Sequence, residues 1–339
     1  MKSEKRPTLQ DLIKKTGFSH GAISRAFNGQ KGISDGTRAL ILKTAREIGY
    51  HPNSSARNFK RGYSGRIGII LPNLRNTNYA ELYEQLDYVI SQAGLSSVLA
   101  LTHDDMKREM DIILHWSAGE TDALILNPIR ASENLDLYKK VHSWGYPLFF
   151  LYGIPGSDFD GIGFNYRNSL SKALKYLRDV GHRKVAYVGQ IPLGAKPRGK
   201  YGILLEKLPE FDMEFDEKHS IFDATGDAAG PVALDRWNGM GSRPTAVVAY
   251  NDHTAGSLYY EALYRGMKVP EDFSLLGSDD VAEAKLIGLT TIRSDRTKIA
   301  SEIFSMLQFR MKNPEDPPLQ RALHCELVTR DSLGPAPKQ

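Results

Sequence analysis

Apolar residues in the first fifty positions recur at helical spacing in three short segments. They predict one helix that ends before Gly17, a second between Ser19 and Gly29, and a third between Ser34 and Gly49. The inward-facing residues of these helices are Leu9, Leu12, Ile13, Ala22, Ile23, Ala26, Phe27, Leu40, Ile41, Ala45 and Ile48. Two short helices joined by a glycine turn and completed by a third are a helix-turn-helix arrangement.

From Arg66 onward, short apolar runs alternate with stretches of helical spacing, which is typical of buried strands that alternate with helices. The strand-like runs cover residues 67–71, 97–101, 123–126, 148–151, 162–164, 184–188, 220–222, 246–249 and 274–276. The alternation begins again after Asp160, and such units fold right-handed onto parallel sheets. The sequence therefore predicts an N-terminal all-α helix-turn-helix unit and an α/β body of two similar lobes with parallel sheets and a cleft between them.

The charge is divided unevenly along the chain. Residues 1–62 hold thirteen Lys and Arg against four Asp and Glu, a net charge of +9. The remaining residues hold 31 basic and 36 acidic side chains, a net charge of −5. A cationic segment with helical patterning, attached to an acidic body, indicates that the segment binds a polyanion such as DNA.

Three further features exclude other classes of protein. The single cysteine, Cys325, rules out a disulfide framework, and its apolar surroundings favour a buried structural thiol. No run of about eighteen apolar residues predicts a membrane span. The charged residues 1–6 lead into no apolar segment of the kind found in secretory signals, so a cytoplasmic location is expected.

The second predicted helix carries the candidate base contacts, because the N-terminal residues of such a helix meet base edges in the major groove. Its outward positions include His20, Gly21, Ser24 and Arg25. Arg25 can bond to guanine O6 and N7 through two N–H groups, or it can instead hold a phosphate. His20 can contact a base or phosphate, or be a solvated residue at the helix start. Gly21 has no side chain, so its base step is read loosely or by shape.

The N-terminal residues resemble the headpiece of lactose-repressor-type (LacI/GalR) transcription regulators, with the order and spacing of the motifs kept throughout. The matching pieces are Thr8-Leu9-Gln10-Asp11-Leu12, Phe18-Ser19, Ile23-Ser24-Arg25, Phe27-Asn28-Gly29, Ile33-Ser34, Thr37-Arg38 and Gly49-Tyr50-His51-Pro52-Asn53. The resemblance implies that His20, Gly21 and Arg25 are the main base-reading positions. The DNA-binding residues expected in total are Thr8, Ser19, His20, Gly21, Ser24, Arg25, Asn28, Ser34, Asn53, Ala56 and Phe59.

Residues 53–65 correspond to the hinge and linker of that family. In the family, this segment folds into a helix when two subunits sit on operator DNA, and an apolar side chain, usually Leu, enters the minor groove. Phe59 stands at that position, and a Phe side chain is a plausible wedge between base steps. The other interpretation is that these residues form only a flexible tether.

The body also resembles the family, whose core is similar to periplasmic sugar-binding proteins. The matching pieces are Gly181-His182-Arg183-Lys184-Val185-Ala186, Pro244-Thr245-Ala246-Val247, Asn251-Asp252, Val269-Pro270-Glu271-Asp272, Gly277-Ser278-Asp279-Asp280 and Leu289-Thr290-Thr291-Ile292. The expected domains are a headpiece (1–52), a hinge and linker (53–65), a two-lobed core (66–332) and a tail (333–339). The first lobe is expected to take about 66–161 and 292–320, and the second about 162–291 and 321–332.

Polar residues at predicted strand ends are the candidate ligand contacts, since ligands of such sheets bind beyond the carboxyl ends of the strands. By position in the family, these residues are Asn78, Tyr79, Asn165, Arg198, Asn251 and Asp279. Their chemistry suits a polyol, and Tyr79 or Trp237 can stack on a sugar face. The alternatives are that one residue of each pair, Asn251-Asp252 and Asp279-Asp280, caps a helix or forms a turn, and that Arg198 is a surface charge.

Catalytic and cofactor motifs are missing from the sequence, which has no zinc-binding spacing, phosphate-binding loop, dinucleotide fingerprint or nucleophile elbow. We therefore expect no enzyme, metal or cofactor. The favoured interpretation is a repressor that acts as a homodimer on near-palindromic double-stranded operator DNA and responds to a small, carbohydrate-like effector. The alternatives are a solute-binding protein with an incidental basic N-terminus and an α/β enzyme fused to a DNA-binding module.

Overall fold

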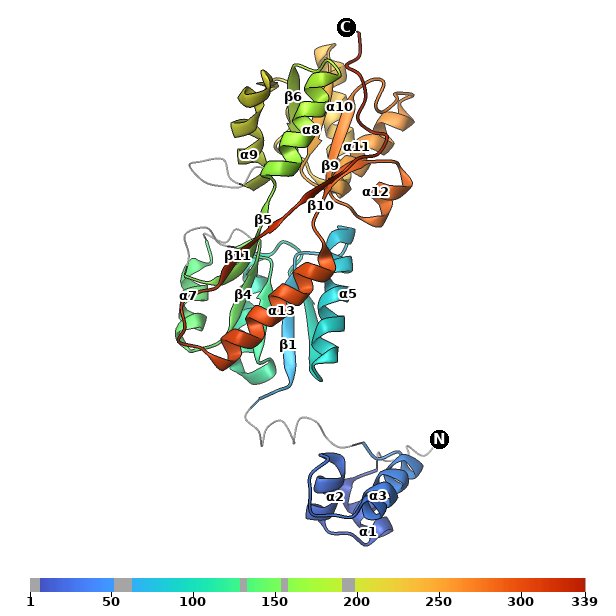
Figure 1. Cartoon of the computed structure of the whole chain (residues 1–339), viewed down its shortest axis with the longest axis vertical. Helices are drawn as coiled ribbons and strands as arrows, with labels where there is room; N and C mark the ends of the chain where they lie inside the picture. Colours follow the sequence, from blue (N-terminus) through green and yellow to red (C-terminus); the bar gives the residue numbers. More distant parts are fainter. Residues whose placement is uncertain (1–6, 52–62, 129–132, 154–157, 191–198, 339) are drawn as a thin grey trace. The chain divides into compact units, whose positions relative to one another are not determined.

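The computed structural model describes residues 7–51, 63–128, 133–153, 158–190 and 199–338. The chain forms two compact units, Met1–Ser64 and Gly65–Gln339, and we call the second the body (Figure 1). Among the described residues, no helix combines the length and apolar character that a membrane crossing requires.

The first unit contains the three predicted helices. They are α1 (Leu9–Thr16), α2 (His20–Phe27) and α3 (Asp35–Ile48). Gly17, at φ +73°, ends α1 in the left-handed conformation that glycine adopts without strain. The small core consists of the buried residues Leu12, Ile23, Ala26, Ile41 and Ala45. The predicted helix-turn-helix arrangement is therefore confirmed.

The first lobe of the body is built on a six-stranded parallel sheet in the order β11-β5-β4-β3-β1-β2. Its strands are β1 (Arg66–Leu71), β2 (Ser96–Leu101), β3 (Ala123–Leu126), β4 (Leu148–Leu151), β5 (Asp160–Asn165) and β11 (Gln320–His324). Its helices are α5 (Thr77–Gln92), α6 (Met106–His115), α7 (Leu135–Ser143) and α13 (Arg296–Lys312), with a π-helical turn at Trp116–Glu120. Helices α5 and α13 pack on one face of this sheet, and α6 and α7 pack on the other.

The second lobe has a six-stranded sheet in the order β12-β10-β9-β8-β6-β7, in which only the β12–β10 pair is antiparallel. Its strands are β6 (Lys184–Val188), β7 (Glu214–Phe215), β8 (Ala246–Ala249), β9 (Ser274–Asp279), β10 (Thr290–Arg293) and β12 (Glu326–Val328). Its α-helices are α8 (Arg167–Asp179), α9 (Gly199–Lys207), α10 (Ala229–Met240), α11 (Asp252–Tyr264) and α12 (Ala282–Leu286). Short 3₁₀ turns occupy Leu208–Phe211 and Gly226–Ala228. The predicted two-lobed α/β body is confirmed.

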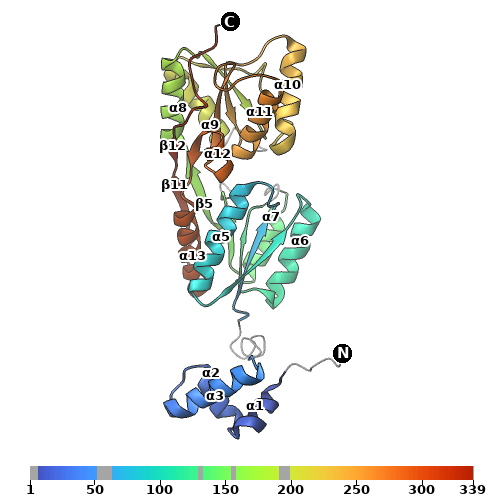
Figure 2. The same ribbon diagram turned by 90° about the vertical axis from the view of Figure 1, so that its right-hand side faces the viewer.

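The chain passes between the lobes from β5 to α8, from β10 to α13, and from β11 to β12 (Figure 2). The expectation that the strand at 162–164 opens the second lobe is wrong, because β5 pairs with β4 and with the distant β11 in the first sheet. The predicted strand at 220–222 is reduced to a single bridge between Ile221 and Val188. Local alternation of strands and helices does not reveal which sheet a strand joins, and it missed β11 and β12.

Candidate functional site

The residues that α2 buries in the headpiece core determine which of its side chains face outward. Ala22, Ile23 and Ala26 face the core, so His20 and Gly21 are exposed while Ser24 and Arg25 are half-buried. At the start of the helix, the Ser19 hydroxyl accepts a hydrogen bond of 3.3 Å from the N–H of Ala22. The candidate base contacts therefore stand together on a capped, rigid helix.

The side chain of Arg25 lies close to Gly21 and Gly32. A methyl group placed on Gly21 would stand 3.8 Å from Nη2 of Arg25, and one placed on Gly32 would stand 3.5 Å from its Cδ. Among the described residues, no acceptor faces the buried Nε of Arg25. The Nε therefore faces the interior of the headpiece, and the part of Arg25 that can act as a donor to another molecule is the end of its guanidinium.

Other predicted DNA contacts are engaged within the headpiece. Thr8 caps α1 and exchanges hydrogen bonds with Asp11, while Ser34 caps α3 by accepting from the N–H of Thr37 at 3.1 Å. Asn28 ends α2, and its amide donates to the carbonyl of Ser24 at 2.8 Å. The remaining predicted contacts, Asn53, Ala56 and Phe59, lie outside the described residues.

In the body, Asn78 and Tyr79 occupy the first turn of α5. The amide of Asn78 donates to the hydroxyl of Tyr152 at 3.3 Å, and its oxygen accepts from Nε of Arg296 at 3.0 Å. The Tyr79 hydroxyl accepts from the amide of Asn127 at 2.8 Å. Burial raises the pKa of Tyr79, which keeps its phenol neutral and able to donate a hydrogen bond.

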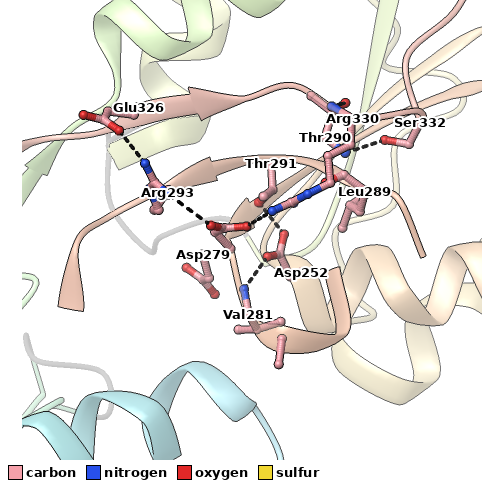
Figure 3. Close-up of polar contacts among 12 residues, drawn as sticks. Asp252, Asp279, Val281, Leu289, Thr290, Thr291, Arg293, Glu326, Arg330 and Ser332 are labelled. Carbon is pink, nitrogen blue, oxygen red and sulfur yellow. Dashed lines mark hydrogen bonds and ion pairs between the residues drawn. The ribbon is translucent and has the colours of Figure 1, made fainter. Parts of the chain in front are cut away.

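Asp279 and Asp280, at the end of β9, have different surroundings. The carboxylate of Asp280 accepts from Nη2 of Arg330 at 2.5 Å and lies 3.8 Å from Nη1 of Arg293. Asp279 stands apart from these contacts, and no described residue donates a hydrogen bond to its carboxylate (Figure 3). Burial, followed by the nearby Asp252 carboxylate, raises the pKa of Asp279 to about 8. Asp280 is therefore held by two arginines, whereas the Asp279 carboxyl group has no donor among the described residues.

Lys200, in the first turn of α9, is a buried cation that sequence reasoning missed. Its Nζ donates to the carbonyl of Ala249 at 2.9 Å and to that of Tyr250 at 2.5 Å. Burial lowers its pKa to about 8, although the Asp279 carboxylate acts in the opposite direction. Helical spacing could have identified it, because Lys200 precedes Leu204 by one helical turn and both lie on the buried face of α9.

Tyrosine hydroxyls gather around Asp279. Burial raises the pKa values of Tyr152, Tyr166 and Tyr250, and the charge of Asp279 raises all three further. The ring of Tyr152 lies 5.2 Å from that of Phe164. Neutral phenols beside a carboxylate can donate and accept hydrogen bonds with the hydroxyl groups of a ligand.

Three of the remaining ligand candidates make contacts within the body, and the fourth lies outside the described residues. Asn251 caps α11 by accepting from the N–H of Thr254 at 2.9 Å, as one of the two earlier interpretations allowed. The side chain of Asn165 accepts from the N–H of Arg167 at 3.1 Å. Trp237 is buried against Phe273 and donates to the carbonyl of His219 at 2.8 Å, so its suggested stacking on a sugar is wrong. Arg198 lies outside the described residues.

Comparisons with known proteins agree with this arrangement. Residues 174–333 match the model of the periplasmic binding protein-like domain. The HTH-type transcriptional repressor PurR of Edwardsiella ictaluri is 25% identical over 342 residues, covering 97% of this chain and 98% of that protein. The HTH-type transcriptional regulator YkvZ of Bacillus subtilis is 23% identical over 325 residues, covering 96% of this chain and 99% of that protein.

Two solved structures show the same fold. The lac repressor dimer, bound to operator and the anti-inducer ONPF, has a TM-score of 0.83 at 20% identity and covers 97% of this chain and 99% of its own. A transcriptional regulator of the LacI family from Sanguibacter keddieii has a TM-score of 0.68 at 25% identity, covering 79% and 98%. Relatives that match both the headpiece and the body, together with these structures, make the chain similar over nearly its whole length to LacI/GalR-type transcriptional regulators.

Proposed function

We propose that this chain is a sequence-specific repressor of transcription whose operator affinity is controlled by a small effector bound in the body. The observation that carries the proposal is the outward side of α2, where the exposed His20 and Gly21 and the half-buried Arg25 stand together in a strongly basic segment. Proteins of the LacI/GalR family regulate transcription, so the chain is a regulator and not an enzyme.

The small size of one headpiece implies that two subunits bind one operator. One helix-turn-helix reads only a half-site, so a homodimer on a near-palindromic operator supplies the second half. The lac repressor, which shares the fold, is a dimer bound to operator. We place base reading on His20, Gly21 and Arg25 and assign Phe59, with Asn53 and Ala56, to a hinge in residues 53–65.

The effector is carbohydrate-like in this proposal. Asn78, Tyr79 and Asp279 offer an amide, a neutral phenol and a carboxyl group, a set suited to a polyol. Solved relatives of similar fold include a regulator CelR–cellobiose complex and a LacI family regulator from Enterococcus faecalis with bound ribose. The expected domain division, headpiece 1–52 and core 66–332, and a cytoplasmic, nucleoid-associated location belong to the same proposal.

Selection from a pool of random DNA duplexes tests the DNA half of the proposal. The full chain is expected to enrich an inverted repeat, whereas Arg25→Ala retains duplexes without enriching a sequence. The matched control, Arg46→Ala, removes one exposed charge from α3 and should still enrich the repeat. Recovery of no common sequence by the unaltered chain would refute the function.

A thermal-shift screen tests the effector half. The panel contains D-ribose, lactose, cellobiose, sugar phosphates and opines, each added to the full chain. A ligand of the body is expected to raise the melting temperature in proportion to the logarithm of its concentration above Kd. Asp279→Ala should abolish that shift while leaving selection of the operator unchanged. A normal shift in this variant would remove Asp279 from the site.

A further inference from the structure

The turn after β9 holds two successive residues in a conformation that side chains rarely adopt. Asp279 has a φ of +126° and Asp280 a φ of +57°, and neither is glycine. Such a backbone persists only where surrounding contacts hold it, and it is found where a side chain must be aimed. We call these two residues the 279–280 turn and ask which contacts hold it.

One set of contacts comes from the second lobe itself. The carboxylate of Asp280 is held by Arg330 and Arg293, which belong to the segments after β12 and in β10. The N–H of Val281 donates to Oδ2 of Asp252 at 3.1 Å, and the other oxygen of Asp252 accepts from the hydroxyl of Thr291 at 2.6 Å (Figure 3). These contacts fix the Asp280 side and leave the carbonyl of Asp279 free for another donor.

The second set comes from the first lobe. Arg296, the first residue of α13, donates from Nη2 to the carbonyl of Asp279 at 2.8 Å and from Nη1 to that of Asp280 at 3.5 Å. Glu81 of α5 accepts from the N–H of Ala282 at 3.2 Å. One turn earlier in α5, the hydroxyl of Thr77 donates to Glu283 at 2.8 Å. The first lobe therefore grips the 279–280 turn and the start of α12 from α5 and α13.

Arg296 is itself fixed by α5. Its Nη2 lies 3.1 Å from Oε2 of Glu81, and its Nε donates to Oδ1 of Asn78 at 3.0 Å. Only 12% of the Arg296 side chain is exposed, so this charged group is desolvated and depends on its partners. A planar guanidinium with N–H groups on several sides can serve all of these acceptors at once, which a lysine cannot.

We propose that Arg296 is a positioning residue that fastens the strained 279–280 turn to the first lobe and thereby fixes the two lobes around the candidate effector site. Two of the candidate ligand residues, Asn78 through its side-chain oxygen and Asp279 through its backbone carbonyl, are bound to the same guanidinium. Separation of the lobes leaves Arg296 paired with Glu81 but removes its two carbonyl acceptors, so the turn loses its first-lobe support. The proposal rests on the proposed function only in naming this place an effector site.

The test measures the distance between the lobes in the full chain without DNA or effector. Spin labels are placed on Lys107→Cys of α6 and Asn238→Cys of α10, which are exposed, whereas the native Cys325 is buried. Labelled chains are diluted with unlabelled chains, so that distances between subunits do not contribute. The parent is expected to give one narrow distance distribution between these labels.

Arg296→Gln is expected to replace that distribution by a longer and broader one. The matched control, Arg293→Gln, also loses a contact to Asp280, but the ion-pair partners of Arg293, Asp280 and Glu326, both belong to the second lobe. It should therefore keep the parental distribution. An unchanged distribution in Arg296→Gln, or an equal change in both variants, would overturn the proposal.

A second variant guards against a loss of folding. Glu81→Gln keeps an oxygen for the N–H of Ala282 but removes the charge beside Arg296, and a partial change in the same direction is expected. Circular dichroism and urea unfolding identify any variant that is not folded. A folded Glu81→Gln with the parental distribution would also count against the proposal. Because neither DNA nor effector is present, these results stand apart from the tests of operator and effector binding.

Discussion

The headpiece and the body position their candidate contacts by different means. On the headpiece, Thr8, Ser19 and Ser34 are each fixed by a hydrogen bond to an N–H group three residues away. In the body, the 279–280 turn is held by Arg296 and Glu81, about 17 and 200 residues distant in the sequence. Changes in the headpiece should consequently act locally, whereas changes in the body should propagate between elements.

The largest expected effect is a loss of stability in the body that leaves the stability of the headpiece unchanged. Arg310 of α13 forms a buried ion pair with Asp160 of β5, with Nε to Oδ2 at 2.7 Å and Nη2 to Oδ1 at 2.9 Å. Asp160→Ala leaves the guanidinium buried without a carboxylate, so the body should lose about 3–5 kcal/mol of its free energy of unfolding. Urea unfolding followed by far-UV circular dichroism measures this loss.

The control for that prediction is an exposed pair of the same lobe. Arg321 of β11 pairs with Glu302 of α13, and its side chain is 55% exposed. Arg321→Gln should change the free energy of unfolding by less than about 0.5 kcal/mol. Equal losses in the two variants, or a headpiece that unfolds together with the body, would contradict the separation drawn above.

The sequence predicted the parts of the molecule that depend on short-range patterns. Caps, glycine turns and helical spacing located α1, α2 and α3, and apolar runs located β1, β3, β4, β6, β8 and β9. Such patterns do not predict the pairing of strands that are distant in the sequence. In the structure, β5 lies in the first sheet between β4 and β11, and β11 is formed by Gln320–His324. The edge strand β7 has only two residues, too few to leave an alternation.

The candidate sites show the same limit. The sequence nominated Asn78 and Asp279, and the structure joins them through Arg296, which no local pattern marks. It also nominated Trp237 as a stacking ring, because periodicity does not distinguish a ring in the core from one beside a ligand. Lys200 was missed, since a lysine on an apolar helix face is usually read as a solvated residue.

The next effect in size concerns base reading. Arg25→Ala should reduce discrimination between operator and scrambled DNA by about 1–3 kcal/mol, because a bidentate contact to guanine is lost. Gel-shift titration with both duplexes at one salt concentration measures the ratio of affinities. If Arg25 instead holds a phosphate, both affinities fall together and the ratio stays constant. The melting temperature of the body should not change, as expected of a local effect.

A smaller effect concerns protonation inside the body. Asp279 has its pKa raised from 3.8 to about 8, so between about pH 4 and 8 the folded state holds a proton that the unfolded state has released. Stability from this group is therefore present at low pH and is lost as pH rises toward 8. Lys200, with its pKa lowered from 10.5 to about 8, acts above pH 8 in the opposite direction. A measurement below pH 8 thus keeps the titration of Lys200 out of the comparison.

Asp279→Asn removes this titration. Between about pH 6.5 and 7.5 the variant should gain stability relative to the parent, by on the order of 1 kcal/mol at most. The groups that set the pKa of Asp279 are Asp252, Lys200, Arg296 and Glu81. Urea unfolding at both pH values provides the comparison, and Asp111→Asn, an exposed carboxylate of α6, is the control. A difference between Asp279→Asn and the parent that does not change with pH would refute the assignment.

The smallest expected effect tests whether Thr8, the N-cap of α1, also contacts DNA. The hydroxyl of Thr8 donates to Oδ2 of Asp11 at 2.7 Å and accepts from the N–H of Asp11 at 3.4 Å, while the N–H of Thr8 donates to the same carboxylate. These contacts lower the pKa of Asp11 and complete a capping box on α1.

Because both roles of the Thr8 hydroxyl are used within α1, Thr8→Ala should cost about 1 kcal/mol of headpiece stability. Affinity for operator and for scrambled DNA should then fall by the same factor, since a frayed helix weakens every contact that follows it. Thr8→Asn, which restores a capping side chain, should recover both affinities. A loss confined to the operator, and not recovered by Asn, would instead make Thr8 a base or phosphate contact in its own right. In that case a single side chain of the headpiece would both cap and read, and its local contacts would be coupled as closely as those around Arg296.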